Sequence, residues 1–198
     1  ERTHAYVLKH LPDVDMTVAA AAHHGLCIQA GGHVGLWPLN LAESFDRVLT
    51  YEPDPALFEC LKRNTAKAPN ITAERFALGA SSGTAKLRTD KKAGSWAIDP
   101  AGTVEATVVT IDAMLEARGW PRCDAIVLDI EGYEVEALKG AAETLERFRP
   151  VLHVEELGPF RMRSSAFMKS IGYVERARAG RDGLYVHASD LARTFGGG

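Results

Sequence analysis

The sequence lacks both a long hydrophobic run and a strong excess of charge of either sign. Its 23 Lys and Arg residues nearly balance its 26 Asp and Glu residues, which gives a formal net charge of −3. A nearly neutral chain has no bulk attraction to nucleic acid or to an anionic membrane surface. No apolar stretch reaches the roughly 18 residues that a membrane-spanning helix needs, and the apolar segment 18–22 is too short for the core of a signal peptide. The sequence therefore gives no strong signal for nucleic acid as a partner, and we expect no membrane among the partners of this protein.

Cysteine is also scarce. The three cysteines, Cys27, Cys60 and Cys123, lie far apart, and no two of them have the C-x-x-C spacing of a structural zinc site. An odd number of scattered cysteines is typical of reduced thiols and not of a disulfide framework. We therefore predict a cytoplasmic protein without a cysteine-bound zinc ion.

Length and composition indicate one globular domain. The chain has 198 residues, of which 46% are hydrophobic and 25% are charged, and this is enough for a single sizeable core. We expect residues 1–25 to form an N-terminal helical cap on a main domain that covers residues 26–198.

Segments with strand-like and helix-like patterns alternate along the chain. Short apolar runs, typical of strands buried in a parallel sheet, fall at residues 26–30, 47–52, 71–78, 125–129 and 150–155. Helical patterns fall at residues 3–11, 14–24, 36–44, 54–66, 111–118, 133–148 and 160–171. Two more strands, 84–88 and 105–110, flank a polar loop over residues 90–102, and strands 173–178 and 183–187 form a terminal hairpin. This order predicts an α/β, Rossmann-like fold with a doubly wound, mostly parallel seven-stranded sheet that ends in an antiparallel hairpin.

A glycine-rich turn follows the first apolar strand. In Ala30-Gly31-Gly32-His33-Val34-Gly35, a strand leads directly into a turn and then into a helix. Gly31 and Gly35 allow the backbone to pass close to a ligand without a side chain in the way. The start of the helix offers N–H groups to an anionic group of that ligand. The same residues could equally form a plain connection between a strand and a helix.

An acidic residue ends the second apolar strand. Glu52 lies 21 residues after Gly31, and an acid at about this distance can accept hydrogen bonds from both hydroxyls of a ribose. Either acid in Glu52-Pro53-Asp54-Pro55 could also cap the next helix; we assign the capping role to Asp54 and the ribose role to Glu52. The glycines lack the G-x-G-x-x-G pattern, which argues against a nicotinamide-dependent dehydrogenase.

Acidic residues also follow the last two apolar strands. Asp129 and Glu131 come at the end of one strand and Glu155 at the end of the next, where open α/β sheets bind their ligands. Charged side chains sealed in a core would be costly, so we expect these acids to face a cleft. His153 and Glu155 share one face of their strand, and Asp129, Glu131 and Glu155 could therefore converge. Glu131 and Glu134 could instead only favour the start of the following helix.

Together these stretches resemble the FkbM family of methyltransferases. The matching stretches are residues 27–37, 47–64, 108–115, 123–140 and 150–156, which span most of the chain from residue 26 to 156. The most specific of them is Asp129-Ile130-Glu131-Gly132-Tyr133-Glu134, close to the family's Asp-Val-Glu-Gly-x-Glu. The resemblance implies a class I methyltransferase fold, S-adenosylmethionine as the methyl donor and usually a hydroxyl oxygen as the acceptor.

Three positions depart from the family's usual residues. The family commonly has Asp where this chain has Gln29, Asn where it has His33, and Lys where it has Leu128. Gln29 can hydrogen-bond a neighbouring backbone group or the ammonium group of the donor, but it brings no negative charge to that ammonium group.

The motifs and the resemblance define two sets of predicted site residues. The predicted cofactor contacts are Gln29, Gly31, Gly32, His33, Gly35, Glu52, Pro53, Ala77, Leu78 and Asp129. We expect adenine between Pro53 and residues 76–78, and Asp129 near the methionine end of the donor. The candidates for the base that removes the acceptor's proton are Glu131, Glu155 and His153. For His153, a place in the core as a hydrogen-bonded structural residue is the favoured alternative. In a further hypothesis, Asp129, Glu155 and Glu156 hold Mg²⁺ as oxygen ligands.

The predicted function is O-methylation of a hydroxyl on a small molecule or sugar, with S-adenosylmethionine as the donor. One alternative is a protein that binds S-adenosylmethionine without catalysis and acts through partners. A nucleic-acid methyltransferase is another, although the sequence lacks its Asp/Asn-Pro-Pro-Tyr motif and is not basic. A nicotinamide-dependent dehydrogenase is the third, and the glycine spacing disfavours it.

Overall fold

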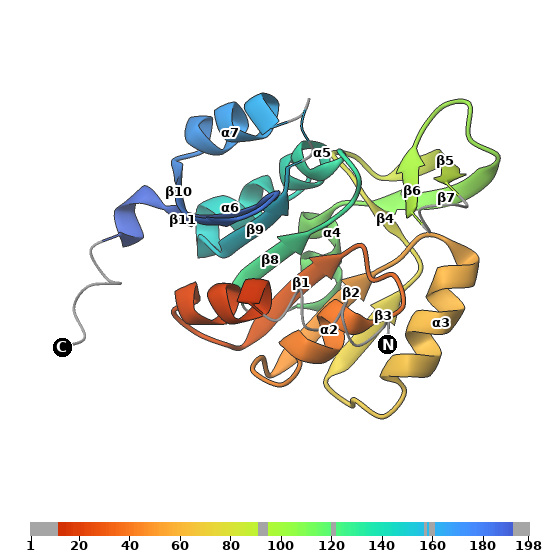
Figure 1. The fold of residues 1–198 in the computed structure, drawn as a ribbon, viewed down its shortest axis with the longest axis horizontal. Helices are drawn as coiled ribbons and strands as arrows, with labels where there is room; N and C mark the ends of the chain where they lie inside the picture. The colour runs from red at the N-terminus through yellow and green to blue at the C-terminus, as the bar shows by residue number, and fades with distance from the viewer. Residues whose placement is uncertain (1–11, 91–94, 120–121, 157, 159–160, 192–198) are drawn as a thin grey trace.

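The computed structural model describes residues 12–90, 95–119, 122–156, 158 and 161–191. Its largest element is a seven-stranded sheet in the order β10-β11-β9-β8-β1-β2-β3 (Figure 1). The strands are β1 (Leu26–Ala30), β2 (Arg47–Tyr51), β3 (Ile71–Glu74), β8 (Ala125–Leu128), β9 (Val151–Glu155), β10 (Tyr173–Ala179) and β11 (Asp182–His187). All neighbours pair in parallel except those of β11, which is antiparallel to both β9 and β10. This confirms the prediction of a mostly parallel sheet that ends in a hairpin.

The four central strands end in close register at one edge of the sheet. Ala30 of β1 pairs with Tyr51 on one side and with Leu128 on the other, and Leu128 pairs with Val154. All four residues are buried, as the apolar runs in the sequence predict. Residues that directly follow these strands therefore meet at the carboxyl edge, where open α/β sheets bind their ligands.

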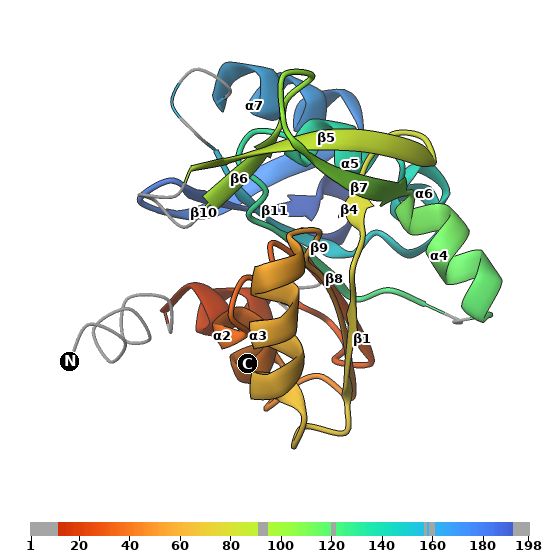
Figure 2. The same ribbon diagram turned by 90° about the vertical axis from the view of Figure 1, so that its right-hand side faces the viewer.

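Helices cover both faces of the main sheet (Figure 2). The helices are the N-terminal helix (residues 12–20), α2 (Leu36–Leu41), α3 (Pro55–Thr65), α4 (Ile111–Arg118), α5 (Glu134–Lys139), α6 (Ala142–Phe148) and α7 (Arg161–Ser170). Cys27 of β1 packs in one buried cluster with Val14 of the N-terminal helix and Trp37 of α2. Its neighbour Ile28 packs in a second cluster with Leu138 of α5. Consecutive residues of β1 therefore face opposite layers of helices, which is why the strand is apolar except at Gln29.

The N-terminal helix covers residues 12–20, whereas the sequence predicts a helix over residues 14–24. The helix predicted over residues 3–11 lies outside the described part of the chain. Within that described part, no helix is both long and apolar enough to cross a membrane.

A small four-stranded sheet in the order β4-β7-β5-β6 lies beside the main one (Figure 1). Its strands are β4 (Ala77–Leu78), β5 (Gly83–Asp90), β6 (Ser95–Ile98) and β7 (Val104–Val109). The prediction of one strand over residues 71–78 is wrong, because the chain leaves β2 after Glu74 and residues 77–78 pair with β7 instead. The polar loop predicted over residues 90–102 contains β6, which pairs with β5. Leu87 of β5 is fully buried and packs with Leu57 of α3, so the small sheet has a core of its own.

The single helix predicted over residues 133–148 is two helices. α5 ends at Lys139 and α6 begins at Ala142. Between them, Gly140 approaches Gly79 so closely that a Cβ on Gly140 would lie 2.1 Å from the Gly79 carbonyl oxygen. The carboxylate of Asp112 accepts hydrogen bonds at 2.9 Å from the N–H groups of residues 143 and 144, and so caps α6. Contacts with distant segments therefore break a helix that its own periodicity would continue.

Candidate functional site

The glycine turn after β1 is held against two neighbouring strand ends. The N–H groups of Gly31 and Gly32 donate to the Tyr51 carbonyl oxygen, at 3.1 and 2.9 Å. Gly31 has a positive φ of 83°, and a Cβ on it would lie 1.9 Å from the carbonyl oxygen of Asp129. A residue with a side chain does not fit there. The turn is therefore fixed between the ends of β2 and β8.

The turn continues through two further residues with a positive φ. The φ of His33 is 46° and that of Gly35 is 98°. The N–H of Gly35 donates to the Gly32 carbonyl oxygen at 2.8 Å, and α2 begins directly afterwards. The predicted tight turn between strand and helix is thus present.

Glu52 ties the glycine turn to the chain beyond β2. Only 1% of its surface is exposed. One carboxylate oxygen accepts the N–H of His33 at 2.8 Å, and the other accepts the N–H of Asp54 at 2.9 Å. The role of Glu52 as an acceptor for the ribose hydroxyls stays a prediction. Asp54 caps α3 by accepting the N–H groups of Ala56 and Leu57, at 2.8 and 2.9 Å, which confirms its predicted capping role.

Gln29 lies beneath the turn and is fully buried. Its side-chain amide donates to the carbonyl oxygens of Ala30 and Gly31, at 3.1 and 3.0 Å. Its amide oxygen accepts a hydrogen bond from the hydroxyl of Thr50 in β2. Of the two roles that the sequence allows for Gln29, these bonds correspond to the one that supports neighbouring backbone.

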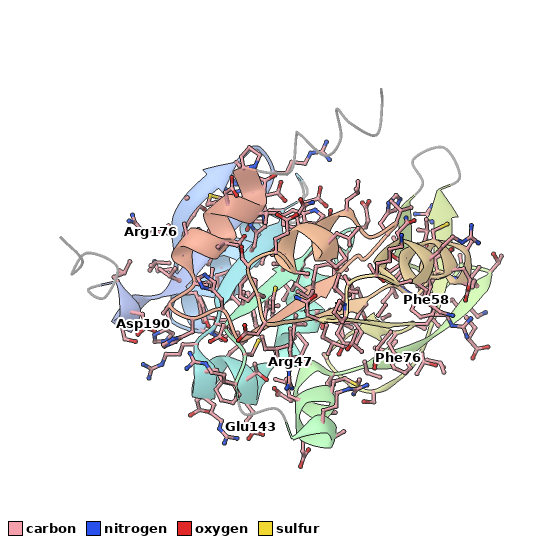
Figure 3. The ribbon with its side chains drawn as sticks, turned by 90° about the horizontal axis from the view of Figure 1, so that it is seen from below. Arg47, Phe58, Phe76, Glu143, Arg176 and Asp190 are labelled. Atoms are coloured by element: carbon pink, nitrogen blue, oxygen red, sulfur yellow. The ribbon has the colours of Figure 1, made fainter. Side chains whose placement is uncertain are left out.

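The apolar residues predicted to enclose adenine come from two segments of the fold. Pro53 follows β2, whereas Ala77 and Leu78 form β4, and all three are buried. Phe76, between β3 and β4, packs against the main core. In Figure 3 it lies toward the small-sheet end of the molecule, as does Phe58 of α3. An adenine site at this place stays a prediction.

Carboxyl groups from β8, β9 and β11 meet beside the glycine turn. Glu155 ends β9 and pairs with Asp182 at the start of β11, and Asp129 directly follows β8. Burial, followed by the charge of Asp129 and a hydrogen bond with it, raises the pKa of Glu155 to about 9. The charges of Glu131 and Asp182 act in the same direction. The structure thus brings Asp129, Glu131 and Glu155 together.

Glu131 lies on a strained turn between β8 and α5. Its φ is 57° and that of Gly132 is 96°; the left-handed region costs a residue with a side chain about 1–3 kcal/mol, and such strain often marks functional sites. Glu134 holds this turn, because its Oε1 accepts the N–H groups of Ile130 and Gly132, at 3.2 and 3.0 Å. Glu134 is buried, and burial raises its pKa. From the sequence, Glu134 is expected only to favour the start of the following helix. Its position two residues after Gly132 is a signal for the observed role, because an acid at this spacing can accept the N–H of the glycine.

Glu156 points away from the other acids, and the predicted Mg²⁺ ligand set is therefore wrong. Its carboxylate accepts the hydroxyl of Tyr185 at 2.8 Å and that of Ser165 at 3.4 Å, and it forms an ion pair with Arg178. Successive side chains at the end of a strand point to opposite faces, so Glu155 and Glu156 do not act on one ion. Glu156 joins β9 to the hairpin instead.

His153 lies on the Glu155 side of β9 and is 1% exposed. Its Nδ1 is 2.7 Å from the hydroxyl oxygen of Thr17 in the N-terminal helix. The ring packs edge-on against Trp37, with the ring centroids 5.2 Å apart. Its Nε2 is 3.8 Å from Oδ1 of Asp182. The role of His153 as the catalytic base stays a prediction.

Comparison with known proteins links this geometry to one family. The Methyltransferase FkbM domain matches residues 29–175, a range that includes the glycine turn and the acids after β8 and β9. A curated relative, the hexuronic acid methyltransferase AglP of Haloferax volcanii, is 28% identical over 102 residues. That match covers 50% of this chain and 43% of the relative.

Solved structures of low identity share the fold. The methyltransferase FkbM from Methylobacillus flagellatus KT superposes with a TM-score of 0.60 at 20% identity, over 82% of this chain and 43% of that one. The magnesium protoporphyrin IX methyltransferase of Synechocystis PCC 6803, solved with bound S-adenosylmethionine, gives 0.53 at 14% identity, over 91% and 80%. At these identities the likeness concerns the fold alone. The chain spans less than half the length of AglP and of the M. flagellatus protein in these matches.

Proposed function

Because this chain belongs to the FkbM methyltransferase family, we propose that it transfers a methyl group from S-adenosylmethionine to a hydroxyl oxygen of a sugar or another small molecule. The observation that supports the proposal is that Asp129, at the carboxyl edge of the sheet, contacts both the glycine turn and the acidic residues beside it. Asp129 touches Gly31 of the glycine turn with its backbone and interacts with Glu155 through its side chain. A donor bound on the turn would thus lie beside acids that can bind an acceptor.

The residues around the turn suit S-adenosylmethionine. We assign the carboxylate of Glu52 to the ribose hydroxyls, and Gly31 and Gly32 keep side chains away from the turn. Asp129 would place a carboxyl group near the positively charged methionine end of the donor. The bound donor supplies an electrophilic methyl group. We assign Gln29 an indirect role, because its hydrogen bonds fix the backbone of the turn.

Methyl transfer needs an acceptor oxygen held in line with the methyl carbon and the sulfur. A carbon–oxygen bond forms as the carbon–sulfur bond breaks, and the acceptor's proton must leave the oxygen. We assign that proton to the carboxylate of Glu131, because the strained turn after β8 holds it near Asp129 and Glu155. We assign Glu155 to a hydrogen bond with the acceptor. His153 is buried more deeply on the same strand and would support Glu155.

The acidic residues around Glu155 also indicate which charge the acceptor has. AglP is named for hexuronic acid, which carries a carboxylate at neutral pH. Asp129, Glu131 and Asp182 all raise the pKa of Glu155 through their charge, and the same charges would repel an anionic acceptor. We therefore propose a neutral sugar or other neutral hydroxyl compound as the acceptor.

The organisation of the chain and its location belong to the proposal as well. We propose that residues 1–25 cap a single domain over residues 26–198, and the packing of Val14 against the main sheet supports this. We also propose a cytoplasmic location, for which the scattered cysteines remain the argument.

The test has two stages. Calorimetry should show binding of S-adenosylhomocysteine, and a screen of neutral and uronic sugars with S-adenosylmethionine should reveal a methylated neutral product by mass spectrometry. Glu131→Gln should then lower turnover by roughly 10²-fold or more, with unchanged melting temperature and S-adenosylhomocysteine affinity. Glu146→Gln, on the exposed face of α6, is the matched control and should behave as the wild type. Binding without turnover on any acceptor would instead favour a non-catalytic binding protein.

A further inference from the structure

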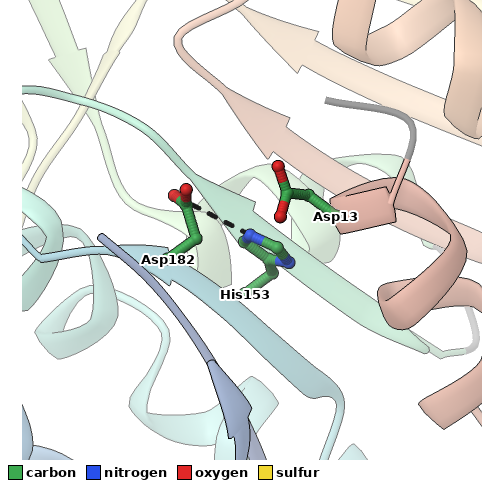
Figure 4. A group of neighbouring side chains, drawn as sticks. All are labelled: Asp13, His153 and Asp182. Atoms are coloured by element: carbon green, nitrogen blue, oxygen red, sulfur yellow. Dashed lines mark ion pairs between the residues drawn. The ribbon is translucent and has the colours of Figure 1, made fainter. Parts of the chain in front are cut away.

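Three side chains from distant parts of the sequence meet beneath the acids of the sheet edge. They are Asp13 of the N-terminal helix, His153 of β9 and Asp182 of β11 (Figure 4). One ligand atom from each lies within 4.8 Å of the other two. Asp13 and His153 are buried, with 5% and 1% of their surface exposed, whereas the side chain of Asp182 is 20% exposed.

The hydrogen bonds of Thr17 fix the tautomer of His153. The Thr17 hydroxyl donates to the carbonyl oxygen of Asp13 at 2.9 Å. A hydroxyl has a single hydrogen, so in its 2.7 Å contact with His153 the Thr17 oxygen must accept a hydrogen from Nδ1. The other ring nitrogen, Nε2, therefore faces the carboxylates with its lone pair in the neutral ring.

Nε2 of His153 is buried and has no hydrogen-bond partner among the described residues. The Oδ1 atom of Asp182 is 3.8 Å away, which is too far for a hydrogen bond. A proton shared by the two groups would draw them to about 2.7–2.9 Å. A metal ion bonded to both at about 2.0–2.2 Å would hold them roughly 3–3.5 Å apart, and this needs only a small movement of a partly exposed side chain.

The surroundings of His153 also favour a cation. A metal-binding histidine usually donates its second ring N–H to an outer partner that orients the ring, and Thr17 is that partner here. The charge of Asp182 acts on Glu155 together with those of Asp129 and Glu131, so negative charge accumulates on this side of β9. Arg181 lies 3.9 Å from Glu155, but its side chain is 71% exposed and solvent screens its charge.

We propose that Asp13, His153 and Asp182 form a binding site for a divalent transition-metal ion. One imidazole nitrogen and two carboxylates suit Mn²⁺ or Zn²⁺, whereas Mg²⁺ and Ca²⁺ prefer oxygen ligands alone. The three side chains leave coordination positions for water or for an oxygen of a small molecule. This site shares no residue with the Mg²⁺ set predicted from the sequence, and it does not depend on the proposed methyl transfer.

Binding can be measured on the full chain without any turnover. After treatment with a chelator, the protein is titrated with Mn²⁺ and free Mn²⁺ is followed by electron paramagnetic resonance. We expect one Mn²⁺ per chain, displacement by Zn²⁺ and little displacement by Mg²⁺. Pulsed measurements on the bound Mn²⁺ should show coupling to an imidazole nitrogen, a signal that only histidine ligation gives.

Variants separate the ligands from their neighbours. His153→Gln and Asp182→Asn should each weaken Mn²⁺ binding by roughly tenfold or more, and Thr17→Val should do so through the ring orientation. Asp15→Asn, exposed on the same helix, and His187→Gln, which removes a different histidine, are matched controls and should bind Mn²⁺ as the wild type does. If His153→Gln does not fold, Asp182→Asn still tests the site. The side chain of Asp182 is partly exposed, so we expect this variant to fold.

Either of two results would overturn the proposal. One is the absence of stoichiometric Mn²⁺ or Zn²⁺ binding by the wild-type chain, which would leave His153 as a buried histidine that only contacts Thr17 and Trp37. The other is wild-type affinity for Mn²⁺ in the folded variants His153→Gln and Asp182→Asn, which would mean that neither side chain is a ligand. Calorimetry with S-adenosylhomocysteine on the same samples tests the cofactor site separately, so failure of one proposal is distinguishable from failure of the other.

Discussion

Replacement of Gly31 by alanine tests how firmly the cofactor turn is fixed to the sheet. A Cβ at this position would lie 1.9 Å from the Asp129 carbonyl oxygen, whereas real Cβ atoms essentially never approach another heavy atom to less than 3.0 Å. Because the contact is with backbone, no flexible side chain can move aside. The turn and the end of β8 must therefore separate by roughly 1 Å, since the packed interior has no void to absorb the methyl group.

Two effects add in the expected loss of stability. Gly31 has a φ of 83°, and the left-handed conformation costs a residue with a side chain about 1–2 kcal/mol. An extra methyl group in a close-packed contact typically costs about 1–3 kcal/mol. We therefore expect Gly31→Ala to lower the free energy of unfolding by about 2–5 kcal/mol. It should also weaken S-adenosylhomocysteine binding by roughly 10²-fold, because a displacement of about 1 Å at a site has effects of this size.

Gly119 provides a matched control for the conformational part of this loss. It ends α4 with a φ of 58°, and a Cβ there meets nothing within 4 Å. Gly119→Ala should therefore cost only about 1–2 kcal/mol and leave ligand affinity unchanged. Urea denaturation measures the stability of both variants, and calorimetry measures their affinity for S-adenosylhomocysteine. Equal losses of stability in the two variants, with wild-type affinity in Gly31→Ala, would refute the role of the contact with β8.

Three further substitutions test other parts of the site. Glu52→Ala removes the acceptor of two partly buried N–H groups and should lower the free energy of unfolding by about 1.5–3 kcal/mol for each bond; unchanged S-adenosylhomocysteine affinity in calorimetry would contradict the ribose role. Burial raises the pKa of Glu134 above its ordinary value of 4.5. As pH rises through the raised pKa, the free energy of unfolding of the wild type should therefore fall relative to that of Glu134→Gln. If urea denaturation gives parallel stability profiles for the two proteins between pH 4 and 8, the carboxyl group does not titrate as inferred. Glu156→Gln weakens a buried ion pair with Arg178 and should lower the free energy of unfolding by about 3 kcal/mol, while the affinity for S-adenosylhomocysteine stays unchanged. A loss of that affinity without a loss of stability would place Glu156 in the site.

The main elements of the fold follow from local patterns in the sequence. The runs at β1, β2, β8 and β9 are mostly apolar on both faces, which is typical of strands that helices cover on both sides. Asp54 caps α3 as predicted, because a capping bond joins residues two or three positions apart. The acids after β8 and β9 could be expected to meet for a similar reason, since parallel neighbours end at one edge of a sheet.

Tertiary contacts decided the rest. The strand over residues 71–78 divides because residues 77–78 find their partner in β7, far along the chain, and the helix over residues 133–148 breaks where Gly140 meets Gly79 and Asp112 caps α6. Periodicity describes only what neighbouring residues prefer, so it cannot report a contact with a distant segment.

Within the site, too, local sequence patterns predict some features and tertiary contacts decide others. The sequence by itself determined that Glu155 and Glu156 are acids at a strand end, but the hairpin residues Tyr185 and Arg178 decided that Glu156 serves the fold. His153 could be placed on the Glu155 face from strand alternation alone. Its association with Asp13 depends on how the N-terminal helix packs against the sheet, and such packing is set by the shapes of many side chains together and not by any local pattern.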